Sequence, residues 1–401
     1  MAILAELMNG DDTRAYASEP EARMDNSTMT GLDQTGSTGA ESVTGIGRQP
    51  LIDNYMSLIQ ERAIYYPVAY TFERELGRGR QGSVFVGLRQ GARGCVTRHA
   101  IKVFDPGIYS NAKKYWTDMG RIASQVSTLH RLRSPNLVAM ESYDEVNGIG
   151  YVQMEVINGL DLRQVLRGVY HQGVKALCTE DEWRDIHKGI FRSSEQGGLA
   201  IQPGVAIYIM RMVLKGLETL HEAGFIHSDV KPSNVMVDRF GYVKLIDYGR
   251  AARPRERSTI LFGSPLYMAP EVHRRDPISE RADLYSTGMV GLELMAGRPV
   301  VDPTDLQEAD LLSIKESLPG QVETFLPPSV RENAYLVEVM RRMLDPDPAN
   351  RHEDAVAAES GDQGLRTVHT QLTKIGQDAD YARLMGFYMA KAVAVREAAL
   401  V

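Results

Sequence analysis

The chain has 401 residues, of which 43% are hydrophobic and 24% charged, a composition typical of a soluble globular protein that can bury a sizeable core. Its formal net charge of -7 argues against a nucleic-acid or anionic-membrane binder, because either function needs a concentrated basic face. Only two cysteines, no signal-peptide pattern at the start and no run of about 18 apolar residues predict a cytoplasmic protein without disulfides.

Residues 1–49 are rich in Gly, Ser, Thr, Asp and Glu and show no sustained period. Such a composition buries too little apolar area to offset the entropy of ordering, so a disordered tail is predicted. It is either a plain leader or a regulatory, autophosphorylated segment. Over residues 50–66 apolar side chains recur at helical spacing, which predicts a lead-in helix ended by Pro67.

The next stretch, YTFERELGRGRQGSVFVG, predicts two strands joined by a turn that contains Gly77, Gly79 and Gly82. Glycines in a turn let backbone N–H groups approach phosphates, because no Cβ stands in the way. Alone, this pattern fits a dinucleotide-binding fold or a plain hairpin equally well. A following strand, HAIKVF, carries Lys102, and no Ser or Thr follows a Gly-Lys pair as a P-loop would require.

Two further segments precede the most informative part of the chain. The stretch from Ser110 to Pro135 predicts a helix, and YVQMEVINGLDL predicts a strand and a hinge. A stripe of Met and Val of this kind is more often core than the wall of a ligand site.

Residues 167–202 are predicted to be an insertion, in which Thr179 and Glu182 have the spacing of a capping box and so predict a short helix. Insertions in surface loops cost little, so neutral drift and a docking surface for a partner are both open. After Pro203 apolar residues at helical spacing predict a buried helix capped by Gly224.

The stretch FIHSDVKPSNVMVDRFGYVKLIDYG brings chemically useful groups together. Asp229, Lys231, Asn234 and Asp247 supply a carboxylate, an ammonium, an amide and a second carboxylate. Phosphoryl transfer needs such groups, because it rests on positioning the acceptor hydroxyl and neutralising charge with Mg²⁺. Asp229 is predicted to orient and deprotonate the hydroxyl and Lys231 to hold phosphate. The two remaining residues are predicted to ligate the metal.

Taken together, these segments resemble the motifs of the eukaryotic-type (Hanks-type) serine/threonine protein kinases. HSDVKPSN corresponds to the family's HRDLKPxN, DYG to DFG and MAPE to the APE motif, in the family's order after the glycine-rich loop and the strand lysine. The resemblance covers residues 70 to about 352. It implies a bilobal α+β fold with a small antiparallel-sheet lobe carrying one helix (67–155) and a larger, mainly helical lobe (156–352). A helical extension, predicted as two helices, occupies 353–401 and either packs on the large lobe or binds a partner.

The resemblance implies ATP and Mg²⁺ as cofactors and a protein substrate with a Ser or Thr acceptor, since Lys231 and Ser264 match the serine/threonine-specific members. Lys102 would contact the α- and β-phosphates, and Asp161 the ribose. The residues implied to bind the nucleotide are Gly77, Gly79, Gly82, Val84, Ala100, Lys102, Met154, Glu155, Val156, Asp161 and Met236.

Two buried ties are implied as well. Glu271 of the APE motif would pair with Arg351, and the carboxylate of Asp283 would accept hydrogen bonds from the backbone of the catalytic loop. An isolated carboxylate on an apolar helix is expensive unless it is bonded in this way.

Three positions depart from the family pattern. Gln125 stands where the family has a Glu that pairs with the strand lysine, and Asp118, two helical turns earlier, is the alternative partner. Ser228 replaces an Arg that receives a phosphate from the activation segment, and Tyr248 replaces the Phe of DFG. Because Gln125 carries no charge, we expect a kinase of reduced activity, and we expect the Tyr248 substitution to be tolerated.

Two other functions stay open. A pseudokinase that binds nucleotide, or nothing, would act as a scaffold through the insertion or the tails. A small-molecule kinase would share the base and metal residues but would not need an APE-type segment. Within the activation segment, Ser258 and Thr259 lie beside several arginines and are predicted sites of phosphorylation.

Overall fold

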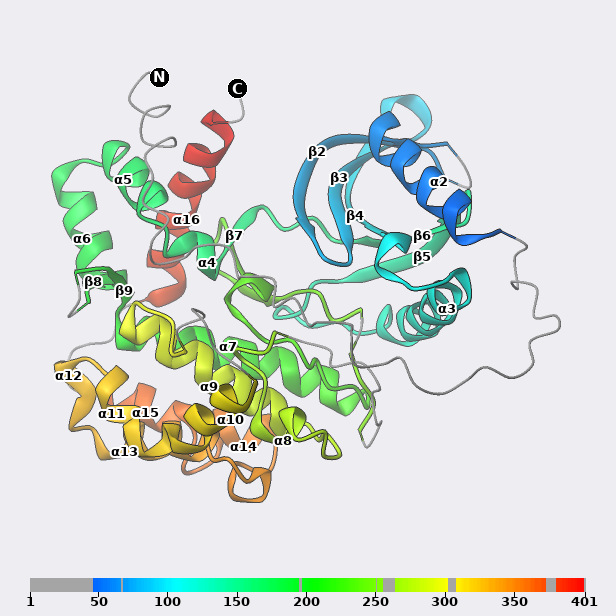
Figure 1. Cartoon of the computed structure of the whole chain (residues 1–401). Coiled ribbons are helices and arrows are strands. Elements are labelled where there is room, and N and C mark those ends of the chain that lie inside the picture. The colour runs from blue at the N-terminus through cyan, green and yellow to red at the C-terminus, as the bar shows by residue number, and fades with distance from the viewer. Residues whose placement is uncertain are drawn as a thin grey trace. The chain divides into compact units, whose positions relative to one another are not determined.

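The computed structural model describes residues 46–65, 68–194, 197–249, 251–254, 264–301, 308–372 and 380–399. These residues form two compact units (Figure 1). The small unit comprises residues 46–132 and 139–156, and the large unit residues 133–138 and 157–399. Most of the predicted tail, residues 1–45, lies outside the described residues.

The small unit is built on an antiparallel sheet that has six strands in its described residues, in the order β1-β2-β3-β4-β6-β5. Their bounds are β1 (Ala63–Ile64), β2 (Tyr70–Gly79), β3 (Gly82–Gln90), β4 (Val96–Phe104), β5 (Met140–Val146) and β6 (Ile149–Met154). The predicted glycine-rich hairpin is formed by β2 and β3, and Gly79 pairs with Gly82 at its end. Gly82 has a φ of 138°, and a Cβ there would lie 1.9 Å from the carbonyl oxygen of Val103. This turn therefore requires glycine.

Two α-helices, α2 (Arg48–Glu61) and α3 (Ala112–Leu129), and two short 3-10 turns, η2 (Ala92–Gly94) and η3 (Pro106–Ile108), complete the described part of the small unit. The lead-in helix was expected to run to Pro67, but α2 ends at Glu61. Arg62 adopts a left-handed conformation with a φ of 54°, and its N–H bonds the carbonyl of Leu58, which closes the helix. The chain then enters β1, which pairs with β2.

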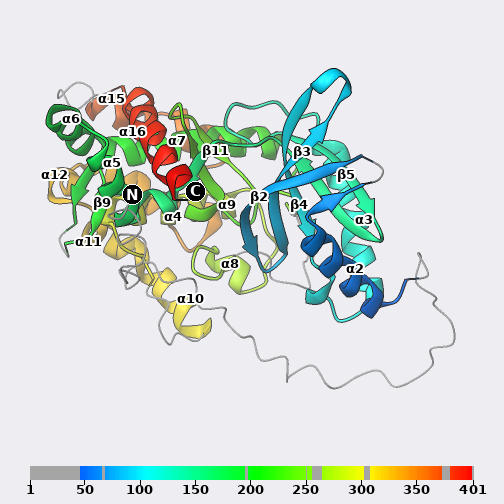
Figure 2. The same ribbon diagram turned by 90° about the horizontal axis from the view of Figure 1, so that it is seen from above.

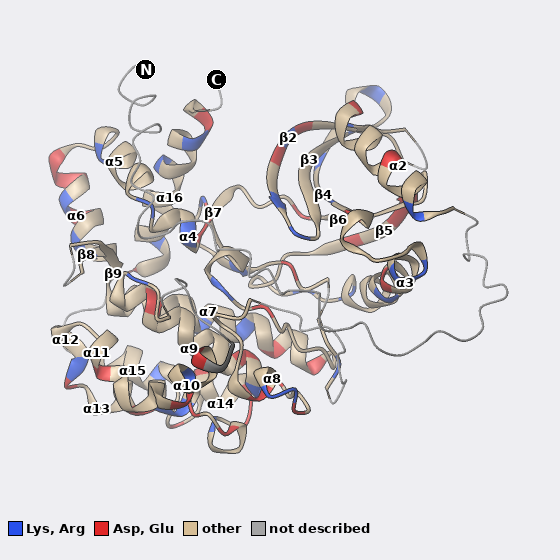
Figure 3. Cartoon of the chain, in the orientation of Figure 1, with Lys and Arg blue, Asp and Glu red and all other residues tan. Residues whose placement is uncertain are grey.

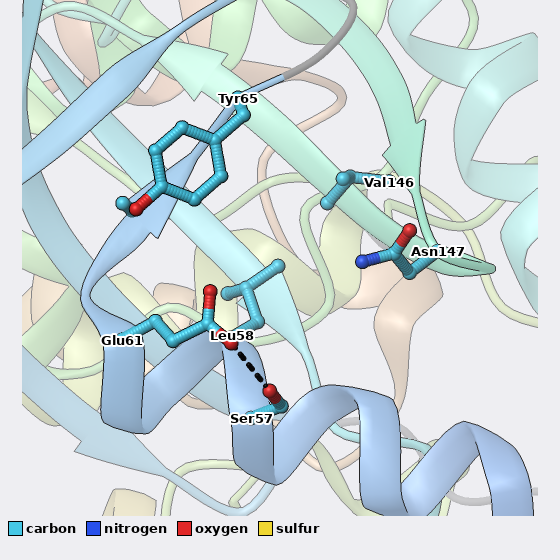
Figure 4. A pocket seen from close by; sticks show the side chains of 7 residues that line it. Ser57, Leu58, Glu61, Tyr65, Val146 and Asn147 are labelled. Atoms are coloured by element: carbon cyan, nitrogen blue, oxygen red, sulfur yellow. Dashed lines mark hydrogen bonds between the residues drawn. The ribbon is translucent and has the colours of Figure 1, made fainter.

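A hollow of about 220 Å³ lies between α2, β1 and the turn that joins β5 to β6 (Figure 4). Ser57 donates a hydrogen bond to Glu61 at its edge, at 2.7 Å. Pockets for nucleotide-sized ligands measure roughly 300–1,000 Å³, so this one is too small. Its lining contains none of the predicted site residues: Ser57, Leu58, Glu61, Ala63, Tyr65, Val146 and Asn147.

The large unit is mainly helical (Figure 2). Its strands are β7 (Gly159–Asp161), β8 (Phe191–Ser193), β9 (Leu199–Ile201), β10 (Val235–Asp238) and β11 (Val243–Leu245). Its helices are α4 (Leu162–Val165), α5 (Gly168–Ala176), α6 (Glu180–Ile190), α7 (Pro203–Glu222), α8 (Pro270–His273), α9 (Arg281–Ala296), α10 (Glu308–Ser317), α11 (Val322–Phe325), α12 (Pro328–Arg331), α13 (Ala334–Met343), α14 (Ala355–Ser360), α15 (Leu365–Leu372) and α16 (Tyr381–Ala398). Short 3-10 turns are η4 (Pro232–Asn234), η5 (Leu318–Gln321) and η6 (Pro348–Asn350).

Helices α7 and α9 pack together at the centre of this unit, and every residue of α9 after Arg281 is buried. The helix predicted after Pro203 is α7, and its predicted cap is confirmed. Gly224 has a φ of 78°, and its N–H bonds the carbonyl of His221 at 2.8 Å.

Residues 133–138 lie in the large unit although they were predicted in the small lobe. The N–H of Val138 bonds the carbonyl of Leu245, and the side chain of Asn136 donates to the carbonyl of Val243 at 2.9 Å. These bonds join the segment to β11.

The insertion folds into α5, α6 and the β8–β9 hairpin. The predicted capping box is confirmed, because Thr179 and Glu182 each accept a hydrogen bond from the other's backbone N–H. Helix α16 packs against α5 and α6 (Figure 1 and Figure 2), and the rings of Phe191 and Tyr388 lie 4.8 Å apart. The insertion and the C-terminal extension therefore form one packed region of the large unit.

The C-terminal extension contains three helices in its described residues, α14, α15 and α16, rather than two. Gly361 and Gly364 separate the first two, and the N–H of Gly364 bonds the carbonyl of Gly361. Basic and acidic residues are scattered over the described helices of both units (Figure 3). No helix in the described ranges is both long and apolar enough to cross a membrane.

Candidate active site

The predicted catalytic loop lies between α7 and β10 and is anchored by Asp283 of α9. This fully buried carboxylate accepts hydrogen bonds from the backbone N–H groups of His227, at 2.7 Å, and Ser228, at 2.8 Å. It also lies 2.9 Å from Nε2 of His221 at the end of α7. The predicted role of Asp283 is confirmed, and its bonds offset the cost of burying a charge.

Two residues of the site adopt a backbone conformation that L-residues rarely take. Ser228 has a φ of 66° and Asp247 a φ of 62°. Each such residue costs on the order of 1–3 kcal/mol and persists only where its surroundings hold it, as at functional sites. His227 supplies part of this hold, since its Nδ1 accepts from the N–H of Asp229 and its Nε2 donates to the carbonyl of Ile246. The ring thereby ties the catalytic loop to the strand end that carries Asp247.

The structure gathers three polar residues around Asp229, namely Lys231, Asn234 and Ser264. Lys231 Nζ lies 3.2 Å from Asp229 Oδ2, and Asn234 Nδ2 donates to the same oxygen at 3.0 Å. The backbone N–H of Ser264 donates to Asp229 Oδ1 at 2.9 Å, while its hydroxyl accepts from Lys231 at 2.6 Å. Both carboxylate oxygens are thus oriented, and an ammonium and a hydroxyl lie beside them. Such a group can position an acceptor hydroxyl and take its proton.

Asn234 and Asp247 have the chemistry that the predicted metal site requires. Asn234 uses its Nδ2 for Asp229, and no donor among the described residues bonds its Oδ1. Its backbone carbonyl accepts from the N–H of Ile246, which brings the residue next to Asp247 in the fold. Mg²⁺ prefers oxygen ligands and is commonly held by one or two side chains plus phosphate oxygens. No group of three or more His, Cys, Asp or Glu in the described residues could hold a metal alone.

Tyr248, which replaces the Phe of DFG, is buried within the large unit and is 1% exposed. A buried tyrosine needs a hydrogen-bond partner for its hydroxyl, and Tyr248 donates to the carbonyl of Val138. The substitution is therefore accommodated without an unsatisfied polar group.

The end of the activation segment is fixed by the predicted ion pair. Both guanidinium Nη atoms of Arg351 bond the carboxylate of Glu271 at 2.7 Å, and both side chains are buried. The Arg351 guanidinium also stacks 4.9 Å from the centre of the Tyr285 ring. Much of the segment, residues 255–263 with the predicted phosphorylation sites, lies outside the described residues.

The small unit carries the other predicted nucleotide residues. Lys102 of β4 is paired with Val84 of β3 on one side and Val152 of β6 on the other. Its side chain is 9% exposed, and its Nζ donates to Oε1 of Gln81 at 3.1 Å. Gln81 lies between the glycines of the hairpin and was missed in the sequence. Its place in the GRGRQGS loop is the only signal that could have pointed to it.

The remaining small-unit residues occupy the strands as expected. Ala100 of β4 pairs with Met154 of β6, so the two lie side by side. Glu155 uses its N–H and its carboxylate to bond the backbone of Ala139. The predicted contact of Glu155 and Val156 with adenine stays a prediction.

In the large unit, Asp161 of β7 pairs with Met236 of β10. The Asp161 carboxylate caps α4 by accepting from the N–H of Gln164, and burial raises the pKa of this carboxyl above its ordinary value. Asp161 therefore has a structural task, and its contact with ribose stays a prediction.

Helix α3 presents Gln125 on its buried face together with Ile122 and Leu129. Asp118 lies on the same helix and accepts from the hydroxyl of Tyr109 and the guanidinium of Arg121. This arrangement favours Gln125 over Asp118 as the residue near the strand lysine, and the pairing itself stays a prediction.

Comparison with known proteins identifies the family. Residues 70–359 match the family model described as protein kinase domain. Serine/threonine-protein kinase PknD of Mycobacterium tuberculosis is 26% identical over 322 residues, 79% of this chain and 43% of the relative. PknA of the same species is 29% identical over 307 residues, 72% of this chain and 61% of the relative.

The chain thus spans about half the length of the curated relatives it matches. Among solved structures, the Mycobacterium tuberculosis PknI kinase domain matches with a TM-score of 0.51 at 22% identity, covering 76% of this chain and 98% of that one. This likeness shows the protein kinase fold. The chain belongs to the protein kinase family, and its curated relatives are bacterial serine/threonine kinases of the Hanks type.

Proposed function

We propose that this protein transfers the γ-phosphoryl group of ATP to Ser or Thr hydroxyls of protein substrates. The observation that carries the proposal is the group around Asp229, whose two carboxylate oxygens are held by Asn234 and by the backbone of Ser264. This leaves the carboxylate oriented to accept the proton of an incoming hydroxyl. Lys231, bonded to both Asp229 and Ser264, supplies positive charge for the transferred phosphate.

The family indicates that the nucleotide is ATP. We assign its binding to the predicted residues of each unit that are named above. Lys102 would contact its α- and β-phosphates. Asn234 and Asp247 would hold Mg²⁺, which when bound neutralises charge on the β- and γ-phosphates. The cytoplasmic location predicted from the sequence stays a prediction.

The competing function is that of a pseudokinase scaffold, which Gln125 and Ser228 favour. Against it, Lys102, Asp229, Asn234 and Asp247 are all present, and the buried bonds of Asp283 hold the strained backbone of the catalytic loop. Such strain clusters at functional sites, and in a catalytic loop it can orient reacting groups.

The test is phosphoryl transfer by the purified full chain, with labelled ATP, Mg²⁺ and a generic basic protein as acceptor. We expect label on Ser and Thr, abolished by chelating the metal and by Asp229→Asn or Asp247→Asn. Asp181→Asn, at an exposed position of α6, is the matched control and should label as the wild type does. Equal label in all three variants would show that Asp229 and Asp247 have neither proposed role. ATP binding without any transfer by the wild type would establish the scaffold instead.

A further inference from the structure

Lys315 lies outside the kinase motifs and is buried against the end of the activation segment, at Pro265 and Met268. Lys315 of α10 has a fully buried side chain. Its Nζ donates to the carbonyls of Pro265 and Met268, the latter at 2.6 Å, and lies 2.8 Å from Nε2 of His273. The ammonium thus has two carbonyl acceptors and, when Nε2 of His273 carries no proton, a third in that nitrogen, which also lies 3.1 Å from the carbonyl oxygen of Pro265. None of these groups is a carboxylate.

Burying an ammonium against neutral partners is costly, so its presence calls for a reason. Burial lowers the pKa of Lys315 to about 7, while the carboxylate of Glu271 acts in the opposite direction. Burial also lowers the pKa of His273 to about 4, so that this ring is neutral at pH 7 and able to accept a hydrogen bond. An apolar side chain of similar volume would fill the same space at lower cost.

The two carbonyls belong to the short segment 264–268, whose first residue is hydrogen-bonded to the carboxylate of Asp229. Its first residue, Ser264, bonds both Asp229 and Lys231. The N–H groups of Tyr267 and Met268 return to the carbonyl of Ser264, at 3.0 Å and 3.2 Å, and close a turn. Lys315 therefore bonds the turn at two places, the carbonyl of Pro265 directly after Ser264 and the carbonyl of Met268 at the end of the turn.

Other side chains hold the same turn on α9. The hydroxyl of Ser286 donates to the carbonyl of Tyr267 at 2.8 Å, and the Tyr267 hydroxyl donates to Glu293 at 2.7 Å. Three successive parts of the turn thus have side-chain anchors. Lys315 bonds the carbonyl of Pro265, the residue after Ser264, which also lies 3.1 Å from Nε2 of His273.

We propose that Lys315 is a positioning residue for the protein acceptor, because it fixes the 264–268 turn and thereby the place of Ser264 against Asp229 and Lys231. This inference rests on the proposed function. It assigns Lys315 to the acceptor side of the reaction, since its contacts are made with the activation segment and α8. Loss of its hydrogen-bond donors should therefore raise KM for the protein acceptor and leave KM for ATP unchanged.

The experiment compares the wild type with Lys315→Met, which keeps the length of the side chain and removes its donors. Lys391→Met is the matched control, because Lys391 of α16 bonds the carbonyl of Leu177 and pairs with the carboxylate of Glu182, both of which belong to the insertion. Three rates are measured for each: transfer at varied acceptor, transfer at varied ATP, and ATP hydrolysis without acceptor. Hydrogen exchange at the amides of Tyr267 and Met268 reports on the turn itself.

We expect Lys315→Met to raise KM for the acceptor about tenfold or more, as the loss of hydrogen bonds to a charged group implies. KM for ATP and acceptor-free hydrolysis should stay within about twofold, and the two amides should exchange faster. An unchanged acceptor KM, or an equal rise in both KM values, would overturn the proposal. If the wild type transfers no phosphate, the proposed function fails, and unchanged exchange in Lys315→Met would separately refute the anchoring.

Lys315→Gln is the second variant, in case the methionine variant does not fold. Its amide still donates two hydrogen bonds, so we expect an acceptor KM between those of the wild type and Lys315→Met. A wild-type acceptor KM together with wild-type exchange in Lys315→Gln would contradict the role of the ammonium.

Discussion

In the large unit, the buried Asp283 accepts two backbone N–H groups, and the buried Glu271 meets the guanidinium of Arg351 in a two-pronged pair. In the small unit, the buried Lys102 donates to a neutral amide, that of Gln81, and the inner face of α3 carries another neutral amide at Gln125. Hydrogen bonds in which one partner is charged contribute about 1.5–3 kcal/mol, and a pair of opposite charges adds to this. The large unit therefore contains a buried pair of opposite charges, whereas on the inner face of α3 the small unit has a neutral amide at the position where the family resemblance implies a carboxylate.

This difference separates two parts of the proposed reaction. The residues proposed to orient the acceptor have charged or backbone partners in the large unit. Position 125 of the small unit carries an uncharged amide in place of the implied carboxylate. From this difference we expect nucleotide binding together with slow phosphoryl transfer.

The largest effect is expected from disrupting the hydrogen bonds between Asp283 and the backbone of the catalytic loop. In Asp283→Asn one backbone N–H of the catalytic loop faces an amide N–H₂, and a buried donor left unpaired costs roughly 1–3 kcal/mol. Ser228 should then relax from its left-handed conformation. We expect transfer to fall about a hundredfold or more, measured at saturating ATP and acceptor. Asp354→Asn, which makes the same substitution at the exposed N-cap of α14 in the same unit, is the control and should keep activity.

If Asp283→Asn retains wild-type transfer and stability, the loop is held by other bonds. In that case the hold attributed to Asp283 is wrong.

The sequence predicted much of this unit and less of the small one. Asp283 and the Glu271–Arg351 pair could be assigned because each lies in a motif that the resemblance identified. The glycine hairpin, α7 and the capping box of α6 followed from local rules that need no tertiary information. Such rules act within a few residues of the chain.

What escaped prediction depends on contacts between distant segments. Lys315 lies in an unremarkable helix, and its partners stand about fifty residues earlier, at Pro265 and Met268. Arg62 ends α2 early by adopting a left-handed backbone, for which Arg gives no signal. The contact of Lys102 with Gln81 joins a strand to a loop, and no spacing rule connects the two.

A pH titration tests how the large unit tolerates its buried lysine. The Lys315 pKa falls from 10.5 to about 7 on folding, so the unfolded chain binds more protons between these values. The unfolding free energy of the wild type should therefore rise as pH increases above about 7, by about 1.4 kcal/mol per pH unit relative to Lys315→Met. His273 does not interfere, because its pKa of about 4 lies below this window.

The measurement is urea unfolding of both proteins between pH 7 and 9. Parallel curves over this range would mean that Lys315 keeps its proton and that its three hydrogen bonds outweigh the effect of burial.

The next prediction tests the small unit by placing at position 125 the carboxylate that the family resemblance implies there. Gln125→Glu would give Lys102 a charged partner, a gain on the order of 1–2 kcal/mol, which corresponds to a roughly five- to thirtyfold faster transfer if it acts on the transition state. ATP affinity should change little. Gln125 is only 4% exposed, so the new carboxylate gains only if the lysine reaches it. Gln172→Glu, on the exposed face of α5, is the matched control.

Turnover and KM for ATP decide this prediction. If Gln125→Glu has no effect while Asp118→Asn abolishes transfer, the helix register is wrong and Asp118 is the lysine's partner.

The smallest effect is expected from the activation segment, where Ser258 and Thr259 lie outside the described residues. A phosphate there could pair with neighbouring arginines of the segment, but position 228 offers a serine in place of the guanidinium that would link it to the catalytic loop. Asp283 already holds the catalytic loop through the N–H of Ser228, so the loop does not need that phosphate to adopt its conformation. Ser258→Ala combined with Thr259→Ala should therefore change transfer at most a few-fold, measured on protein freed of phosphate and on protein incubated with ATP. Loss of nearly all activity in the double variant would mean that another cation carries the signal to Asp229.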